Sequence, residues 1–463
     1  MRTERDSMGE MAVPDDALYG ASTQRAVLNF PISGRPLPPA YIRGLGLVKW
    51  ACARANEELG LLDAAKSAAI QQVALEIAAG ALTAQFPVDV FQTGSATSSN
   101  TNANEVIAQR AARLGGQKLH PNDDVNLGQS SNDIIPTTLH VSVALALHAE
   151  LAPALDGLAV ALEQKSASWT DVVKIGRTHL MDATPLTLGQ EFSGYAAQAR
   201  KAAARCRHAV DVLGELAIGG TAVGTGLNSD PRFGATVARI LSEKTGLPFR
   251  EARNHFEAQG ARDDCVEVGG ELVAIGVGLT KIANDIRLLG SGPRAGFAEL
   301  RLPATQPGSS IMPGKVNPVM SEMLVQVCLY VQGLAHTVAM AGRDGHLELN
   351  ATLPLMAQCL HEAIHCLANG VRVFTEKCVA GLEVDAERCT ELVGRSLMLV
   401  TALNPLIGYD AAAQVAKEAH ATGKTLRQVV LERKLLDAAT LDRVLDPLAM
   451  TKPGAGQPGS AGG

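Results

Sequence analysis

The sequence predicts a mainly α-helical protein of several domains, built around a central bundle of five long helices. Five long segments are rich in alanine, leucine and valine, and only 3% of the residues are aromatic, so the helices must pack closely through small side chains. Stretches 266–279 and 323–341 are apolar nearly all round. A helix without a polar face is buried on every side. Because sister copies of the same bundle would bury it, we expect a homo-oligomer.

The five segments follow one another through the middle of the chain. They span residues 135–165, 190–217, 263–289, 319–343 and 354–380. Before them, residues 1–129 mix short helical stretches with turn-rich ones and form a predicted N-terminal domain. Residues 130–386 form the predicted bundle domain, and residues 387–463 a small helical C-terminal domain. The tail after Pro453 is rich in glycine and lacks an apolar anchor, which is typical of disorder.

Composition excludes several functional classes. The net charge of −6 and the pI of about 6.0 indicate no basic surface for nucleic acid or for an anionic membrane. The first residues lack the apolar stretch of a signal peptide, and no uninterrupted apolar run is long enough to span a bilayer. These features predict a cytoplasmic protein. The 8 cysteines form no CxxC pair, which favours buried thiols over disulfides or a metal cluster.

The most informative loop is residues 307–318, with the sequence PGSSIMPGKVNP. Proline and glycine at both ends exclude a continuous helix or strand and leave a backbone that can act as a hinge. Between them lie the hydroxyls of Ser309 and Ser310, the cation of Lys315 and the amide of Asn317. Such groups could close over an anion and act on it. Taken alone, the segment could also be an ordinary surface connection.

Three further polar clusters lie far apart in the sequence. Residues 93–105 are dense in short hydroxyl and amide side chains, which supply hydrogen-bond donors for an anion. Residues 120–133 precede a long apolar run, so they can cap a helix whose N-terminus is itself an anion site. Residues 176–182 carry His179 in the string GRTHLMD. Each cluster by itself also has a structural explanation as a turn, a cap or a structural histidine.

All four clusters resemble, in the same order, the active-site regions of the fumarase/aspartase superfamily. The similarity runs nearly end to end, from residues 8–10 to residues 407–409, and is strongest to the class II fumarases, the metal-free fumarate hydratases. The resemblance implies a three-domain fold whose five-helix domains form a twenty-helix core in a homotetramer. It implies active sites shared between subunits, with no cofactor and no metal. The implied reaction is the hydration of fumarate to (S)-malate in the tricarboxylic acid cycle, through an aci-carboxylate dianion.

The resemblance also assigns roles to individual residues. Ser309 is the implied base that removes the carbon-bound proton, and its alkoxide requires nearby donors or cations. Thr178 and His179 would handle the water, with Glu322 orienting and charging the imidazole. Lys315 would stabilise the dianion. The implied substrate-binding residues are Ser95, Thr97, Ser130, Ser131, Asn132, Ser310, Lys315 and Asn317, and a second dicarboxylate site is implied at His120, Asn122 and Asp123.

The nearest alternative is aspartate ammonia-lyase, which eliminates ammonia through the same kind of dianion. Aspartases usually carry threonine where this chain has Ser131, which favours a hydroxyl leaving group. Residues 292–296 and 450–454 are instead more similar to aspartases. Ala96 stands where glycine is usual, and residues 351–353 also depart from both patterns. We therefore predict a fumarate hydratase, with aspartate ammonia-lyase as the alternative, and these departures leave the fine substrate preference open.

A different class of function is indicated by His361-Glu362-Ala363-Ile364-His365, which fits the HExxH pattern of zinc proteases. On a helix both imidazoles would share one face, with Glu362 available as a base. The pattern is short and falls inside a predicted bundle helix, so a structural role is the alternative. The glycines of residues 219–226 lack GxGxxG spacing and indicate a backbone turn rather than a nucleotide loop.

Overall fold

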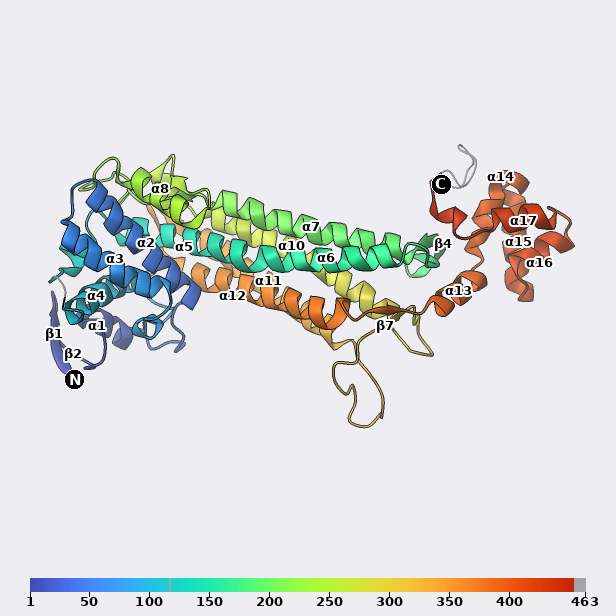
Figure 1. The fold of residues 1–463 in the computed structure, drawn as a ribbon, viewed down its shortest axis with the longest axis horizontal. Helices are drawn as coiled ribbons and strands as arrows, with labels where there is room; N and C mark the ends of the chain where they lie inside the picture. Colours follow the sequence, from blue (N-terminus) through green and yellow to red (C-terminus); the bar gives the residue numbers. More distant parts are fainter. Residues whose placement is uncertain (116–117, 454–463) are drawn as a thin grey trace. The chain divides into compact units, whose positions relative to one another are not determined.

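The computed structural model describes residues 1–115 and 118–453 (Figure 1). Helices contain 62% of the residues and strands 8%, which confirms the predicted mainly α-helical class. The glycine-rich tail that the sequence predicts to be disordered lies outside the described residues from residue 454 onward.

The N-terminal part mixes helices with turns, but one helix of 20 residues is longer than the short helices that the sequence predicts. It opens with an antiparallel hairpin of β1 (Arg2–Asp6) and β2 (Gly9–Val13). The helical elements that follow are α1 (Ala21–Asn29), α2 (Pro39–Glu58), α3 (Ala64–Ala78), η1 (Thr83–Gln85), α4 (Thr97–Arg113) and the π-helical turn η2 (Pro121–Val125).

All five long predicted segments form helices. The first is continuous through a π-helical turn, and the last ends in one. They are α5 (Ser131–Ala146) with η3 (Leu147–Leu151) and α6 (Ala152–Ser168), then α7 (Leu188–Val212), α10 (Asp263–Leu289), α11 (Val319–Gly342), and α12 (Leu353–Phe374) with η4 (Thr375–Val379). Two shorter helices, α8 (Phe233–Thr245) and α9 (His255–Gly260), lie between α7 and α10 in the sequence.

The remaining elements are small. The antiparallel hairpin of β3 (Val173–Thr178) and β4 (Met181–Thr187) separates α6 from α7 in the sequence. Three two-residue pairs join β5 (Glu215–Leu216) to β6 (Arg250–Glu251), β7 (Leu300–Arg301) to β10 (Glu383–Val384), and β8 (Gly345–His346) to β9 (Leu349–Asn350). The C-terminal helices are α13 (Ala386–Arg395), η5 (Met398–Leu403), α14 (Asn404–Ile407), α15 (Tyr409–Thr422), α16 (Leu426–Glu432), α17 (Ala438–Val444) and η6 (Ala449–Thr451).

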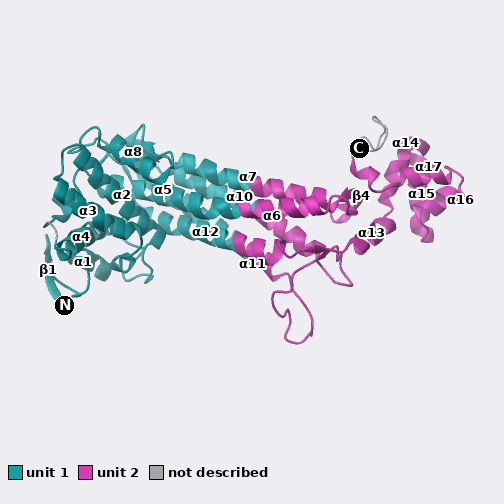
Figure 2. Ribbon diagram, viewed as in Figure 1, with its two compact units in different colours: residues 1–155, 202–278, 326–370 teal, residues 156–201, 279–325, 371–463 magenta. Residues whose placement is uncertain are grey.

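The chain contains two compact units, each made of three separate stretches (Figure 2). Unit 1 comprises residues 1–155, 202–278 and 326–370, and unit 2 comprises residues 156–201, 279–325 and 371–463. The division into domains 1–129, 130–386 and 387–463 stays a prediction.

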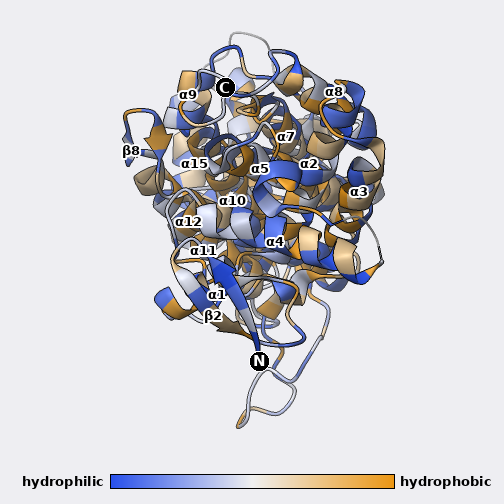
Figure 3. Cartoon of the chain, turned by 90° about the vertical axis from the view of Figure 1, so that its left-hand side faces the viewer, coloured by the Kyte–Doolittle hydropathy of each residue, from blue (hydrophilic) through white to orange (hydrophobic). Residues whose placement is uncertain are grey.

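Unit 1 packs its helices closely through small residues, as the low aromatic content predicts. Helix α2 contacts α3, α5 and α8. A Cβ atom on Gly46 of α2 would lie 2.7 Å from the carbonyl oxygen of Ala74 on α3, so only glycine permits this approach. Figure 3, coloured by hydropathy, shows hydrophobic residues on helices of unit 1. The core of unit 1 is therefore shared among many helices rather than gathered around large rings.

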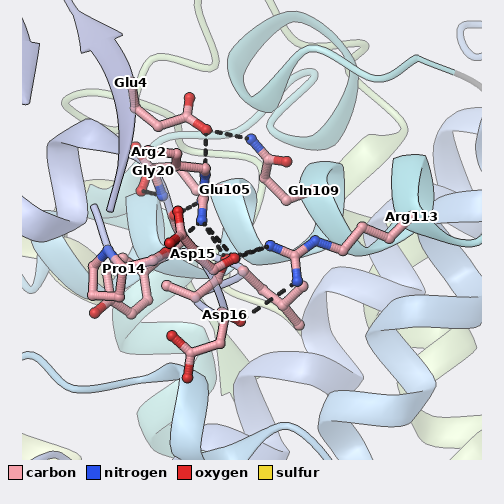
Figure 4. Close-up of polar contacts among 12 residues, drawn as sticks. Arg2, Glu4, Pro14, Asp15, Asp16, Gly20, Glu105, Gln109 and Arg113 are labelled. Atoms are coloured by element: carbon pink, nitrogen blue, oxygen red, sulfur yellow. Dashed lines mark hydrogen bonds and ion pairs between the residues drawn. The ribbon is translucent and has the colours of Figure 1, made fainter. Parts of the chain in front are cut away.

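Buried polar contacts fix the N-terminal segment to unit 1 (Figure 4). The carboxylate of Glu105 on α4 accepts hydrogen bonds from the backbone N–H groups of Gly20 and Thr23, at 2.8 and 3.2 Å. The carboxylate thereby satisfies the free N–H groups at the start of α1. Arg2 and Arg113 donate to backbone carbonyls of residues 14–19. Glu105, which belongs to the polar cluster of residues 93–105, is a structural anchor here.

Unit 2 has its own hydrophobic core in the C-terminal helices. Ile175 of β3 is buried in it, together with residues of α13, η5, α15, α16 and α17. Helix α13 contacts β3, and η5 contacts β4. The C-terminal helices therefore pack directly on the hairpin whose tip carries His179.

The long helices expose apolar side chains. Val277 of α10 is 55% exposed, and Leu329 of α11 is 60% exposed. Two helical stretches, Ser131–Ser168 and Val319–Gly342, are long and apolar enough to cross a membrane by length and composition alone. Core helices of soluble proteins meet the same criterion. The exposed apolar surface of α10 and α11 is thus a feature of the single chain that needs an explanation.

Candidate active site

A chain of hydroxyl groups joins three of the predicted binding residues. Thr97 Oγ1 lies 2.8 Å from Ser95 Oγ and 2.8 Å from Ser131 Oγ, within hydrogen-bond distance of both. Thr97 and Ser131 are the first residues of α4 and α5 respectively. Ser130 is the N-cap of α5 and forms a capping box with Asp133. The N-termini of two long helices therefore meet at these hydroxyls.

Thr97, Ser130 and Ser131 border a cavity of about 440 Å³ in unit 1. It is lined by Thr97, Asn100, Thr101, Asn104, Asn122, Asn126, Gly128, Gln129, Ser130, Ser131, Thr221, Ala222, Leu227 and Asn228. None of these lining residues is acidic. Helix N-termini carry partial positive charge and free N–H groups, and hydroxyl and amide side chains supply further donors. The cavity is thus suited to a small anion, and we call it the anion cavity.

Asp133 holds the wall of the anion cavity together. Its fully buried carboxylate accepts hydrogen bonds from the backbone N–H groups of Ser130 at 2.9 Å, Gly219 at 3.2 Å and Thr221 at 2.9 Å. Burial raises the pKa of this carboxyl group to about 6. The side chain of Asn132 donates to the carbonyl of Ala222 at 2.8 Å. The glycine-rich segment 219–226 is therefore a backbone wall of this cavity, not a nucleotide loop.

The second predicted dicarboxylate site lies at the π-helical turn η2. His120 Nδ1 accepts a hydrogen bond from the backbone N–H of Asp123 at 3.0 Å, so the histidine caps this turn. His120 and Asn122 line a further cavity of about 620 Å³ in unit 1, which Glu4, Asp6 and Glu105 also line. Arg5 and Lys118 line it as well, so its walls carry charges of both signs, unlike those of the anion cavity. Its function as a dicarboxylate site stays a prediction.

Thr178 and His179 lie at the tip of the β3–β4 hairpin in unit 2. His179 and Leu180 have φ angles of 56° and 62°, and positive φ at both central residues is what a type I′ turn requires. Left-handed backbone costs a residue other than glycine roughly 1–2 kcal/mol. Both predicted side chains are exposed in the single chain. The hairpin thus holds an exposed histidine in a strained but defined backbone conformation.

A buried ion network anchors this hairpin, and no local sequence pattern predicts it. Arg177 donates two hydrogen bonds to the fully buried carboxylate of Glu299, at 2.9 and 3.0 Å. Lys174, also buried, lies 3.5 Å from Glu299 and 3.3 Å from Glu191. Burial raises the pKa of Glu191, an effect that the charge of Lys174 opposes. Glu299 thereby holds Arg177, the residue directly before Thr178, in place. The pairing could not be predicted from the sequence because the two residues are 122 positions apart.

The loop of residues 307–318 is folded back on itself. The N–H of Gly308 donates to the carbonyl of Lys315 at 2.8 Å, and Asn317 Nδ2 donates to the carbonyl of Gly308 at 2.7 Å. Ser309 Oγ accepts hydrogen bonds from the backbone N–H groups of Ile311 at 3.2 Å and Met312 at 3.0 Å.

The remaining predicted residues of this region are solvent-exposed. Ser310 and Lys315 are exposed on the loop, and Glu322 is exposed on the first turn of α11. The amide of Asn317 therefore closes the loop, while the side chain of Lys315 is exposed to solvent.

The structure thus assembles the predicted residues in separate groups. Ser95, Thr97, Ser130 and Ser131 meet within unit 1, with Asn132 bonded beside them. Unit 2 carries the hairpin tip and the serine loop. The catalytic and binding roles of all these residues stay predictions.

The HExxH pattern does not form a metal site. His361 is buried, its Nε2 lies 2.9 Å from Ser142 Oγ on α5, and its ring packs edge-on against Tyr41. Burial lowers its pKa to about 3. His365 is exposed and pairs with Asn369 at 3.0 Å. Within residues 1–115 and 118–453, no three His, Cys, Asp or Glu side chains come together as a metal site.

Comparison with known proteins gives two family matches. The family described as Lyase matches residues 9–333, and the family described as Fumarase C C-terminus matches residues 399–452.

Similar proteins and structures cover nearly the whole chain. Fumarate hydratase class II of Mycobacterium tuberculosis (strain ATCC 25618 / H37Rv) is 55% identical over 456 residues, which are 97% of this chain and 96% of the relative. The corresponding protein of Xylella fastidiosa (strain 9a5c) is 49% identical over 100% of this chain and 98% of its own length. A crystal structure of class II fumarase from Schistosoma mansoni has a TM-score of 0.95 at 38% identity, covering 98% of this chain and 99% of that one. The fumarate lyase:delta crystallin from Brucella melitensis bound to cobalt has a TM-score of 0.93 at 45% identity, covering 98% and 100%.

Proposed function

The chain belongs to the fumarase/aspartase superfamily of lyases, and we propose that it is a class II fumarate hydratase, which converts fumarate and water reversibly into (S)-malate. The observation that carries this proposal is the anion cavity. There the N-termini of α4 and α5 meet at the hydroxyls of Thr97, Ser130 and Ser131, with no acidic lining residue. A carboxylate is the ligand that such a set of donors favours.

The proton on the carbon next to a carboxylate is removed by Ser309 in this proposal. The two backbone N–H groups that Ser309 Oγ accepts from would stabilise its alkoxide form. The electron pair left on carbon moves onto the carboxylate, which then carries two negative charges. Lys315 stabilises this dianion by its charge and Asn317 helps to shape the loop around it.

The hydroxyl half of the reaction belongs to the hairpin tip. Thr178 and His179 protonate the hydroxyl as it leaves, or take the proton from water as it arrives. Glu322 orients and charges the imidazole. Ser95, Asn132 and Ser310 complete the binding of the two substrate carboxylates together with the residues of the anion cavity.

We also propose a homotetramer whose active sites combine residues of different subunits. The exposed apolar residues Val277, Leu329 and Met340 on α10 and α11 support it, because a soluble protein buries such surface against a partner. The exposure of Thr178, His179 and Lys315 in the single chain also supports it, since catalysis requires a closed site. We place this tetramer in the cytoplasm, in the tricarboxylic acid cycle, working without a metal.

The deciding experiment follows absorbance at the fumarate band with purified protein and either malate or aspartate as substrate. We expect fumarate to form from malate at a rate far above that from aspartate. A large preference for aspartate would assign the chain to the ammonia-lyases and leave the proposed proton abstraction in place. Ser131, the position at which aspartases usually carry threonine, is the residue to exchange next (Ser131→Thr).

A further inference from the structure

Lys49 is a buried cation that forms no ion pair with a carboxylate among residues 1–115 and 118–453. It lies on α2 and is 1% exposed. Its Nζ donates hydrogen bonds to Asn126 Oδ1 at 3.0 Å and Gln129 Oε1 at 2.9 Å, both neutral amides. Lys174, which is equally buried, is instead paired with Glu191 and Glu299. A buried charge is costly unless it is paired, so a buried lysine whose hydrogen bonds go to neutral amides indicates a charge that is used.

The two amides that hold Lys49 both line the anion cavity. Asn126 Oδ1 also accepts hydrogen bonds from Asn100 Nδ2 at 3.1 Å and Asn104 Nδ2 at 3.3 Å, so three donors converge on one oxygen. Asn100 and Asn104 line the same cavity, and their Oδ1 atoms are buried without a protein partner. Lys49 is therefore one side chain away from the ligand space and orients an amide network that borders it.

One buried carboxylate, that of Asp133, acts on Lys49 through its charge, although the two side chains form no hydrogen bond with each other. The titratable groups that act on it are Cys52 on α2 and Asp133 on α5. Burial raises the pKa of the Cys52 thiol, which therefore stays neutral. The Asp133 carboxylate already accepts three backbone N–H groups. Burial lowers the pKa of Lys49 to about 8, so its proton is lost at mildly alkaline pH.

We infer that Lys49 is a positioning residue of the dicarboxylate site, whose buried charge acts through Asn126 and Gln129 to raise the affinity of the anion cavity for a doubly charged ligand. The inference rests on the proposed function only for the class of ligand. Its physical basis is the low dielectric of the interior, where the field of a cation reaches a neighbouring anion with little screening. The cost of burying Lys49 is offset when the anion binds.

The sign of the pH dependence follows from this placement. The charged form of Lys49 favours the anion, so affinity is highest below pH 7 and falls as pH rises through about 8. Bound anion favours the protonated lysine, which moves the fall to higher pH in the complex. Substrate affinity should therefore change with pH although both ligand carboxylates remain ionised.

Succinate, a saturated four-carbon dicarboxylate, tests the inference because its binding requires no turnover. Calorimetric titrations between pH 6.5 and 9.5 would compare the wild type with Lys49→Met and Lys49→Arg. We expect Lys49→Met to weaken binding at neutral pH by about tenfold and to abolish the alkaline fall. Lys49→Arg should keep most of the affinity and bind equally well throughout the range, because arginine does not titrate there. In the malate assay, Lys49→Met should raise KM more than it lowers kcat.

Lys244→Met is the matched control. Lys244 lies on α8, is exposed and packs over the ring of Trp50, the residue that follows Lys49 on α2, so its replacement by methionine removes the same charge outside the cavity. The Lys244→Met variant should bind succinate as tightly as the wild type does.

Each outcome decides. If the wild type and Lys49→Met bind succinate equally well, the role of Lys49 is overturned and the proposed function stands. If Lys49→Met does not fold, two other results overturn the role of Lys49. One is a folded Lys49→Arg variant that binds succinate much more weakly than the wild type does. The other is a wild-type affinity that does not change across the pH range. Wild type that binds no succinate at all overturns the proposed function and the inference with it.

Discussion

Ser309 and Ser310 are adjacent and chemically identical, yet their surroundings differ. Ser309 Oγ accepts two backbone N–H groups and is half-buried, whereas Ser310 is exposed. Donors that converge on an oxygen favour its charged form. This difference gives a physical reason to assign the base to Ser309.

We therefore expect Ser309→Ala to lower kcat by at least about 10²–10³, the usual effect of losing one preorganised contact, because it removes the base itself. Ser310→Ala should act mainly on KM, since the hydroxyl contributes only to binding. Steady-state kinetics with malate would measure both variants, and each serves as the control for loop position in the other. Loss of turnover in Ser310→Ala with Ser309→Ala nearly intact would reverse the assignment.

Two buried histidines make the folded state sensitive to acid. Burial lowers the pKa of both His140 and His361 to about 3, against an ordinary value of 6.5. The unfolded chain therefore binds more protons than the folded one below pH 6.5, and this part of the stability is lost as pH falls towards 3. The carboxyls of Asp133 and Asp264, whose pKa burial raises to about 6, act in the opposite direction.

His361→Gln should therefore lose less free energy of unfolding than the wild type between pH 7 and pH 5, by about 2 kcal/mol. Urea unfolding at the two pH values would measure the difference. The same substitution at His420, which is exposed, should keep the wild-type dependence. If the free energy of unfolding fell equally in His361→Gln and in the wild type between pH 7 and pH 5, protonation of His361 would not destabilise the fold.

At the scale of elements, the threonine-rich loop before α4 is packed backbone to backbone against the segment before α12. The N–H of Leu353 donates to the carbonyl of Gly94 at 3.0 Å, and a Cβ on Gly94 would lie 1.8 Å from the carbonyl oxygen of Ala351. Ala96, which takes the left-handed φ of 52° before α4, lies in the same loop. Both departures from the superfamily pattern, at 96 and at 351–353, thus fall on elements joined by this contact.

Gly94→Ala should destabilise the protein by about 2 kcal/mol or more, because neither backbone can move without breaking the contact. It should also weaken substrate binding, since the loop carries Ser95 and Thr97. Thermal unfolding and KM for malate would measure the two effects. Gly157→Ala is the control: its Cβ meets no atom within 4 Å on α6, and it should stabilise slightly. Unchanged unfolding of Gly94→Ala would mean that the loop adapts.

At the scale of the whole molecule, the predicted catalytic groups lie on separate loops and remain exposed in one chain. In the proposed tetramer, neighbouring subunits bring them together and cover the apolar surface of α10 and α11. A mutation in one group then inactivates a site without touching the other group. This arrangement allows complementation between inactive variants.

We expect His179→Asn and Ser309→Ala, each inactive alone, to regain partial activity when they are unfolded, mixed and refolded together. Mixed tetramers would contain some sites with both residues intact. Activity and subunit composition of the refolded protein, with each variant refolded alone as the control, would be measured. Verified mixed tetramers without any activity would contradict a site shared in this way.

Five long helices, the order of the polar clusters and the superfamily could be predicted from the residues alone. Helical periodicity and capping residues act over one or two turns, so α5, α7, α10, α11 and α12 could be predicted close to their bounds. The serine loop could be predicted from its residue types alone.

The pairing of distant polar groups emerges only when the elements pack against one another. Lys49 with Gln129, Arg177 with Glu299, and His361 with Ser142 are separated by 80, 122 and 219 positions. No local pattern specifies such pairs, because a buried polar group is satisfied by whichever element packs against it. The HExxH histidine became a core residue for this reason, and a lone lysine in an alanine-rich helix became part of the anion cavity's support.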